Sequence, residues 1–403
     1  MVAMRFDYRD IFRSARLAFS FQRIWIQFIG LLYGYLGYLI FTYLSLLIDG
    51  KNLGDAWSHF GLLPYTSFTP LRFGLIPFII GLLSLLFFWL VTSTGVARAT
   101  YMQLKGNTFY SWREAFTFAL KKKGSSVIST PIAIFAMAFF AGLGGVVVGL
   151  VGRIPYLGEL GISLFAIVWF MASLFIIFIL MAFHVSLFLT PAILATTDDD
   201  AFEGIFQSFS TLYSQPWRFI FYELLVALLA VVGLGVFAFF AKQAWRLLTT
   251  ILIWGMGDKY ADLSYGASYL LQTWIYPIAA WSKAVIGEYS SYFLFTHEFS
   301  AIELPTVMTI SSWILAVFMV IIGGFILSYL FTIFNAGQCV IFLILKKKKD
   351  DENLLERKDK EEEEEEEKEG ETEEKKSGEG QGNEVKKKKA GRKKKERKSS
   401  SSK

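Results

Sequence analysis

The sequence predicts an all-α integral membrane protein with six transmembrane helices, arranged as three amphipathic-helix-plus-hairpin units, and a disordered C-terminal tail. Three observations lead to this fold class. Hydrophobic residues make up 54% of the 403 residues, above the roughly 45–50% of ordinary soluble domains. Six apolar stretches are long enough to cross a bilayer. More than half of the 40 Lys and Arg and of the 35 Asp and Glu lie in residues 346–403.

The apolar stretches all lie in a predicted polytopic domain at residues 1–345. A transmembrane helix needs about 20 mostly apolar residues. Residues 242–304 are expected to form an outer loop with helices in the membrane interface; two additional short spans are the alternative. The six predicted spans cover residues 24–48, 73–96, 127–151, 162–189, 219–241 and 308–330.

Lys and Arg near the span ends predict the orientation, because cytoplasmic loops carry an excess of both. On the proposed inner side, five cations precede the first span, six lie between the second and third spans, and Arg218 lies between the fourth and fifth. The two short outer loops contain only three cationic residues, Lys51, Arg72 and Arg153. We therefore expect a protein of the cytoplasmic (inner) membrane, with both termini in the cytoplasm.

Similar short segments precede the first, third and fifth spans, which indicates an internal repeat. Each segment leads into two consecutive spans, so one unit would be a short helix plus a membrane hairpin. Chance agreement in a chain with 40 Phe is the alternative. The segments are DYRDIF, SWREAF and AFEGIF, and their shared columns are Tyr8, Trp112 and Phe202, then Ile11, Ala115 and Ile205, then Phe12, Phe116 and Phe206.

The first of these segments separates cations from apolar residues when it is drawn as a helix. A helix of this kind lies on the surface of an anionic membrane, with its apolar side down. In the second segment, Ser111 and Glu114 have the spacing of a capping box. The predicted lipid-surface residues are Arg5, Arg9, Arg13, Arg16, Arg23, Lys121, Lys122 and Lys123.

Two ionisable residues fall inside predicted spans, and such residues are functional candidates by default. His184 lies near the inner end of the fourth span and Glu223 near the inner start of the fifth. They would lie at similar depth and could form a pair or a protonatable transport site. Alternatively, each reaches the headgroup region and has no special role. Asn335 and Gln338, beyond the last predicted span, are interpreted as polar contacts.

Small residues and an acidic run give weaker signals. Gly30 and Gly34, and also Gly145 and Gly149, have the GxxxG spacing that lets helices approach closely in lipid. A cavity lining or lipid groove is the alternative. The run at residues 198–200 could bind Mg²⁺, but helix capping explains it better. We predict no metal site and no cofactor.

The stretch TPAILATTDDDAFEGIFQSFSTLYSQPWRFIF, at residues 190–221, resembles a pattern in poorly characterised polytopic membrane proteins. These include the membrane domain fused to some glycerophosphodiester phosphodiesterases. The resemblance implies an extended piece containing Pro191, an amphipathic helix carrying Phe206 and Ser208, and a following span opened by Trp217 and Arg218. The chain has no room for the phosphodiesterase barrel, so the resemblance does not imply that activity.

The predicted function is that of a non-enzymatic membrane scaffold or lipid-organising protein. Its partners would be anionic lipids and a cytoplasmic protein bound through the charged tail; oligomers are compatible with the sequence and nucleic acid is not expected. The alternative is a transporter or flippase-like permease that uses His184 and Glu223. An enzyme acting on lipid comes third, since the sequence has no recognisable catalytic motif.

Overall fold

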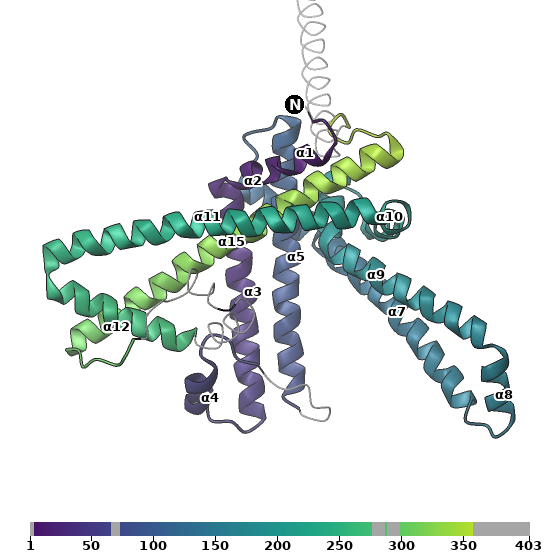
Figure 1. Ribbon diagram of the computed structural model, residues 1–403, viewed down its shortest axis with the longest axis horizontal. Coiled ribbons are helices and arrows are strands. Elements are labelled where there is room, and N and C mark those ends of the chain that lie inside the picture. Colours follow the sequence, from purple (N-terminus) through teal and green to yellow (C-terminus); the bar gives the residue numbers. More distant parts are fainter. Residues whose placement is uncertain (1–3, 66–72, 276–286, 288–298, 358–403) are drawn as a thin grey trace, which may run out of the picture. The chain divides into compact units, whose positions relative to one another are not determined.

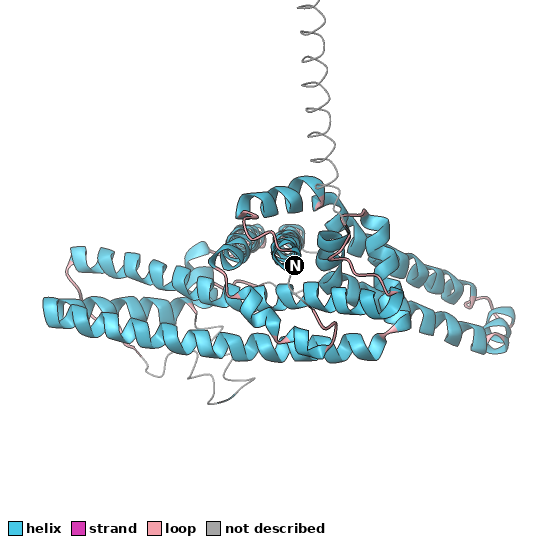
Figure 2. Cartoon of the chain, turned by 90° about the horizontal axis from the view of Figure 1, so that it is seen from above, coloured by secondary structure: helices cyan, strands magenta, loops and turns pink. Residues whose placement is uncertain are grey.

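The computed structural model describes residues 4–65, 73–275, 287 and 299–357. Every regular element in these residues is a helix (Figure 2). The protein is therefore an all-α membrane protein with six transmembrane helices, as the sequence predicts. The six helices that are long and apolar enough to span a membrane are α3 (Phe21–Ile48), α5 (Leu75–Lys105), α7 (Gly124–Val151), α9 (Ala166–Thr197), α11 (Pro216–Met256) and α15 (Thr306–Asp350).

Short helices stand before α3, α7 and α11, at the three places where the sequence predicts them. They are α1 (Tyr8–Ile11) with α2 (Arg13–Ala18), α6 (Trp112–Thr117) with the π-helix η1 (Phe118–Lys122), and α10 (Ala201–Ser214). Asp7 caps α1, and Asp200 caps α10 by accepting the N–H groups of the first turn. The predicted capping box at Ser111 and Glu114 is confirmed, with N···O distances of 2.8 and 3.2 Å.

Consecutive spans form the most extensive helix pairs, so the chain makes three hairpins: α3 with α5, α7 with α9, and α11 with α15 (Figure 1). Pro131 and Pro191 both lie inside helices. The extended segment that the resemblance implies at Pro191 is therefore wrong. Helices in membranes tolerate an internal Pro where neighbouring helices pack around the interrupted backbone, and residues 189–198 are fully buried.

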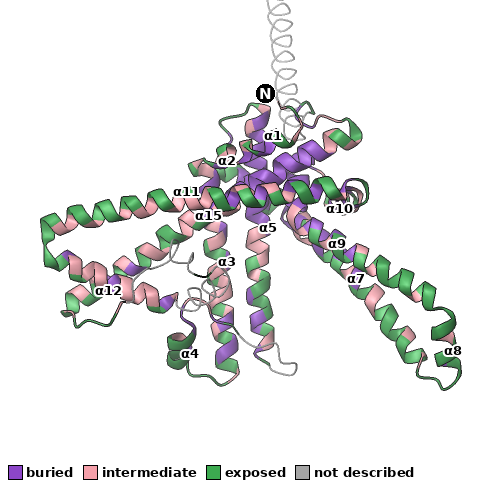
Figure 3. Ribbon diagram, viewed as in Figure 1, coloured by how far each residue is buried: buried purple, intermediate pink, exposed green. Residues whose placement is uncertain are grey.

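One hydrophobic core joins the three hairpins, and we call it the junction. It takes residues from the first part of α3, α7 and α11 and from the last part of α5, α9 and α15 (Figure 3). The spans therefore alternate in direction and bring six like-sided ends together. Each span contributes at least one buried member of the junction: Ile26, Tyr101, Ile134, Leu189, Val226 and Phe342.

The ends of α7 and α9 that lie away from the junction contain no buried residues. In α7 and α9, residues 139–151 and 166–178 are exposed or half-buried (Figure 3). A separate short helix, α8 (Leu157–Leu164), joins them, so the fourth span begins a few residues later than predicted. Apolar side chains without protein neighbours suit contact with lipid chains.

The predicted outer loop at residues 242–304 contains more regular helix than expected. Residues 242–256 continue α11, so the expectation of a separate interfacial helix there is wrong. A second helix, α12 (Asp258–Trp274), packs against α15 and α11. The C-terminus of α12 also meets the segment after α4 (Leu53–Phe60), where the Leu62 N–H donates to the Trp274 carbonyl at 3.0 Å. Residues 276–286 and 288–298 lie outside the described residues.

The charged tail begins later than residue 346. Lys346 to Lys349 belong to the last turns of α15, and the chain then folds back so that Leu354 and Leu355 are 1% and 3% exposed. The Tyr101 hydroxyl donates to the Leu354 carbonyl at 2.8 Å. The first compact unit accordingly covers Met1–Leu355. The prediction of disorder concerns mainly residues 358–403, which lie outside the described residues.

Candidate functional site at the junction

Polar side chains gather in the junction, although the spans as a whole are apolar. Residues 90–102 of α5 are all buried and include five hydroxyl-bearing residues and one arginine. Thr92, Thr94 and Thr100 donate to carbonyls one turn earlier on the same helix, at 2.8–2.9 Å. These local hydrogen bonds satisfy the hydroxyls, because an unpaired polar group in a dry core is unfavourable.

Glu223 is part of a contact between α11 and α15. Its Oε2 accepts a hydrogen bond from the Gln338 amide at 2.7 Å. Among the described residues, Glu223 Oε1 and Gln338 Oε1 are enclosed and have no hydrogen-bond donor. The pair therefore retains acceptor capacity inside the protein.

His184 does not join Glu223. Its side chain is exposed on α9, and its Nδ1 lies 2.8 Å from the Leu180 carbonyl of the same helix. The predicted His184–Glu223 pair is therefore wrong, because Gln338 occupies the position of the Glu223 partner. Sequence reasoning treated Gln338 as an incidental contact because it lies beyond the last apolar stretch.

A second amide pair joins α3 to α15. Asn335 donates to Gln27 Oε1 at 2.8 Å, and both side chains are nearly inaccessible to solvent. The Gln27 Nε2 group has no acceptor among the described residues. Gln27 was not identified from the sequence, although Arg23 and Gln27, one turn apart near the start of α3, give a detectable polar pattern.

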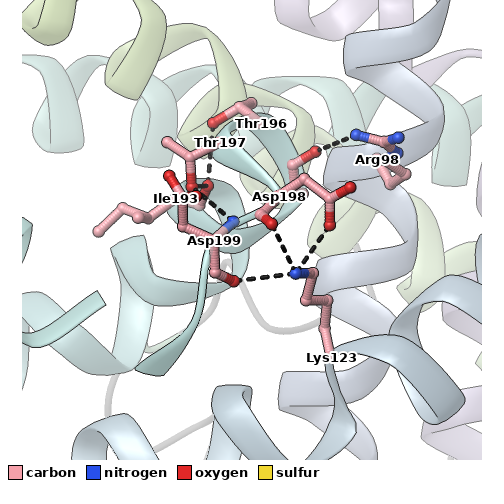
Figure 4. Close-up of polar contacts among 8 residues, drawn as sticks. Arg98, Lys123, Ile193, Thr196, Thr197, Asp198 and Asp199 are labelled. Carbon is pink, nitrogen blue, oxygen red and sulfur yellow. Dashed lines mark hydrogen bonds and ion pairs between the residues drawn. The ribbon is translucent and has the colours of Figure 1, made fainter. Parts of the chain in front are cut away.

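The C-terminus of α9 is held by cations from two other helices (Figure 4). Arg98 of α5 donates to the Ala195 carbonyl at 3.0 Å. Lys123, at the start of α7, lies 2.7 Å from Asp198 Oδ1 and also donates to the carbonyls of Asp198 and Asp199 at 2.8 and 2.9 Å. Positive charge suits the negative end of the α9 dipole. These contacts connect the first hairpin to the second, directly before α10 begins.

The predicted lipid-surface cations divide into two groups. Arg5, Arg9, Arg16, Lys121 and Lys122 are exposed, and Arg13 is half-buried with its guanidinium 3.3 Å from Asp10. Arg23 and Lys123 are 5% and 9% exposed. Lipid-surface contact is therefore wrong for Lys123, which is bonded to Asp198. Arg23 does not belong to the exposed cationic face of the short helices, because its side chain is buried.

The acidic run at residues 198–200 works as capping. Asp200 Oδ1 accepts the N–H groups of Phe202 and Glu203 at 3.1 and 3.4 Å, and Asp198 pairs with Lys123. Within the part of the chain that the structure describes, no three His, Cys, Asp or Glu side chains are grouped as metal ligands. The carboxylates point to different partners, so they do not share one ion.

The two GxxxG pairs lie in different surroundings. A Cβ atom on Gly30 would overlap the side chain of Thr92, and one on Gly34 would lie 3.2 Å from Phe88 Cβ. Gly30 and Gly34 thus lie at the contact of α3 with α5. A Cβ on Gly145 or Gly149 would meet nothing within 4 Å. The helix-packing role is therefore wrong for these two glycines within the chain.

The fold and these contacts define a polytopic helical membrane protein with a polar junction at one end of its spans. Comparisons with protein-family models, curated proteins and solved structures gave no match. The resemblance to the membrane domain of some glycerophosphodiester phosphodiesterases therefore stays a prediction, and the function is argued from the residues themselves.

Proposed function

We propose that this protein is a non-enzymatic membrane scaffold that gathers anionic lipids at the cytoplasmic face of the membrane. The observation that carries the proposal is the outward side of the three short helices. Tyr8, Trp112 and Phe202 are 47%, 37% and 73% exposed. Three residues later in the same repeated segments, Ile11 and Ala115 are fully buried and Ile205 packs against the junction.

Each short helix is therefore fixed to the protein on one side and shows an aromatic ring on the other. This agreement of burial with the aligned columns also supports the predicted internal repeat. Aromatic rings are enriched at the headgroup level of membranes, where one end of the side chain is apolar and the other is wet. Three such rings on three hairpins would keep the junction at that depth.

Cations accompany the exposed rings. The Arg9 guanidinium carbon lies 5.8 Å from the centre of the Tyr8 ring, and that of Arg113 lies 5.3 Å from the Trp112 ring. Lys349 Nζ lies 5.7 Å from the Phe206 ring. Each cation near an anionic surface adds about 1 kcal/mol of attraction. Several cations on one rigid unit would concentrate anionic lipids around it.

The lipid-organising function is tested by the mobility of labelled lipid. The protein is placed in vesicles that contain a labelled anionic phospholipid, and lipid diffusion is measured. We expect wild type to slow the labelled lipid, and the combined variant Arg9→Gln, Arg16→Gln, Arg113→Gln and Lys121→Gln to lose this effect.

The matched control removes four exposed cations remote from the short helices: Lys51, Arg153, Arg246 and Lys259. The control variant should slow the lipid as wild type does. Equal loss in both variants, or no effect of wild type, would refute the proposal. A separate experiment tests the tail. Deleting residues 356–403 should abolish recruitment of a cytoplasmic protein and leave membrane insertion intact.

A permease is the second candidate, and one observation favours it. Glu223 and Gln338 each keep an enclosed oxygen without a donor, so the pair could receive a proton or a polar substrate group. The Glu223→Gln variant in proteoliposomes should then change the pH dependence of solute flux, whereas His184→Gln should not. Identical flux in wild type and Glu223→Gln would remove this candidate.

A further inference from the structure

Arg23 is a buried cation without a counter-charge. It is the third residue of α3 and is 5% exposed. Within the described residues it forms no ion pair, and its enclosed Nε has no hydrogen-bond acceptor. A buried charge is normally paired, because removing it from water is costly. An unpaired guanidinium in a folded protein therefore points to an absent anionic partner.

The neighbours of Arg23 add positive potential and free donors. Cys339 of α15 lies within electrostatic range of both Arg23 and Arg98, so two buried cations add to the positive potential around this thiol. Gln27 lies one turn further along α3 and is fully buried, and its Nε2 group has no acceptor. Arg23 and Gln27 thus present two enclosed donors that lack acceptors on the same side of one helix.

The first turn of α3 supplies more donors. Its N-cap residue, Ser20, makes no side-chain capping bond, and the first N–H to bond back to Ser20 is that of Ile24. The N–H groups of the three preceding residues therefore have no acceptor within the helix. Side chains in a helix lean toward its N-terminus, so the Arg23 guanidinium and these N–H groups lie at the same end of α3. The positive end of the helix dipole adds to the attraction.

The geometry points to a phosphate group as the missing partner. A guanidinium matches the oxygens of a phosphate in a fork, and the N-terminus of a helix is a common phosphate site. Arg23 is also the third residue of α3, close to the end of this span that we place at the lipid headgroups. The adjacent Phe19 and Phe21 are 65% and 71% exposed, so apolar surface for acyl chains lies next to the donors.

We propose that Arg23, Gln27 and the uncapped first turn of α3 bind the phosphate of an anionic phospholipid. The inference that the phosphate belongs to a lipid rests on the proposed lipid-organising function. The inference that a phosphate binds here rests on Arg23. A lipid held here would lie between α3 and α15 and would strengthen the junction. The exposed cations on the short helices would hold the surrounding lipids less specifically.

The test measures thermal unfolding of the full chain in an uncharged detergent free of phosphate. Wild type should unfold at a higher temperature after addition of phosphatidylglycerol, and native mass spectrometry should detect retained lipid. The Arg23→Met variant should show neither effect. Without lipid it should be at least as stable as wild type, because replacing an unpaired buried charge by an apolar side chain is neutral or stabilising. Arg246→Met, at an exposed position on α11 remote from the short helices, is the matched control and should respond as wild type does.

The other outcomes are equally decisive. An equal lipid response of Arg23→Met and wild type would overturn the site. If inorganic phosphate alone reproduces the stabilisation through Arg23, the phosphate site stands and its lipid source falls. If Arg23→Met does not fold, Arg23→Lys keeps the charge without the fork and should show a weaker lipid response. The two proposals can also be separated in the lipid-diffusion experiment. If Arg23→Met still slows the labelled lipid and the variant that lacks the four surface cations does not, the surface effect is independent of the Arg23 site.

Discussion

The two ends of the α7–α9 hairpin are similarly apolar in sequence but have opposite surroundings. At the junction end, residues 189–198 of α9 are buried together with Val127, Thr130 and Ile134 of α7. At the far end, residues 139–151 have almost no protein neighbours. The polar residues of the hairpin lie mainly at the buried end. Apolar content therefore shows which segments can enter a bilayer, whereas polar contacts show where the protein packs on itself.

The largest effect is expected from removing Lys123, the buried cation at the start of α7. In Lys123→Met, the enclosed Asp198 carboxylate would lose the Lys123 ammonium, and stability should fall by about 3–5 kcal/mol. Lys121→Met, two residues earlier and exposed, should cost little. Chemical unfolding in detergent micelles measures both. Comparable losses would show that the ion pair is unimportant to the junction.

The same substitution can be compared at the two ends. Leu354 is 1% exposed in the junction, whereas Leu150 of α7 is 52% exposed. Leu354→Ala should destabilise the protein by about 2–5 kcal/mol, through lost contacts and the remaining cavity. Leu150→Ala removes a half-exposed side chain and should change the unfolding temperature much less. A small effect of Leu354→Ala would mean that the fold-back after α15 is dispensable.

The glycine pairs give a third comparison, with a smaller effect. Gly30→Val would force α3 away from Thr92, and overpacking of this kind costs about 1–3 kcal/mol. Gly145→Val finds open space and should leave the unfolding temperature unchanged in detergent. If Gly145→Val instead dissociates an oligomer, the far end of α7 contacts a second copy of the chain.

The smallest effect concerns an exposed ion pair. Lys347 lies 2.8 Å from Asp351, a separation close to that of Lys123 and Asp198. The hydrogen bond and the charge of Lys347 hold the pKa of Asp351 below its usual range. Because the pKa of Asp351 is lower in the folded state, the pair contributes to folding stability at pH values above the pKa of Asp351 in the unfolded chain. This stability is lost as the pH falls through the pKa of the folded state. Asp351→Asn should remove this slight acid dependence of unfolding, and a large change would contradict the exposed position.

The sequence predicts the six spans because a run of apolar residues is a direct requirement of the bilayer. It underestimates α11 and α15, because a helix can continue past its apolar stretch. Lys is a good helix former, so Lys346 to Lys349 extend α15 instead of ending it. Capping is also predictable, since Ser111 and Glu114 lie three residues apart and need no distant partner.

The junction could not be predicted in the same way. Lys123 and Asp198 are separated by 75 residues, and Asn335 and Gln27 by 308. Helix periodicity says nothing about which of several cations becomes buried, so Arg23 and Lys123 looked equivalent to their exposed neighbours. The pairing of Glu223 with Gln338 instead of His184 likewise depends on how α11 and α15 pack.

The length of α15 has a mechanical consequence. Its 45 residues make a rod of roughly 67 Å at 1.5 Å per residue, about twice the thickness of the hydrocarbon layer. The leading part of the rod packs against α12, and the trailing part packs against α3, α5, α9 and α11. A helix of this length must tilt in the bilayer or extend beyond its hydrocarbon layer, so a change in bilayer thickness would change the tilt of α15.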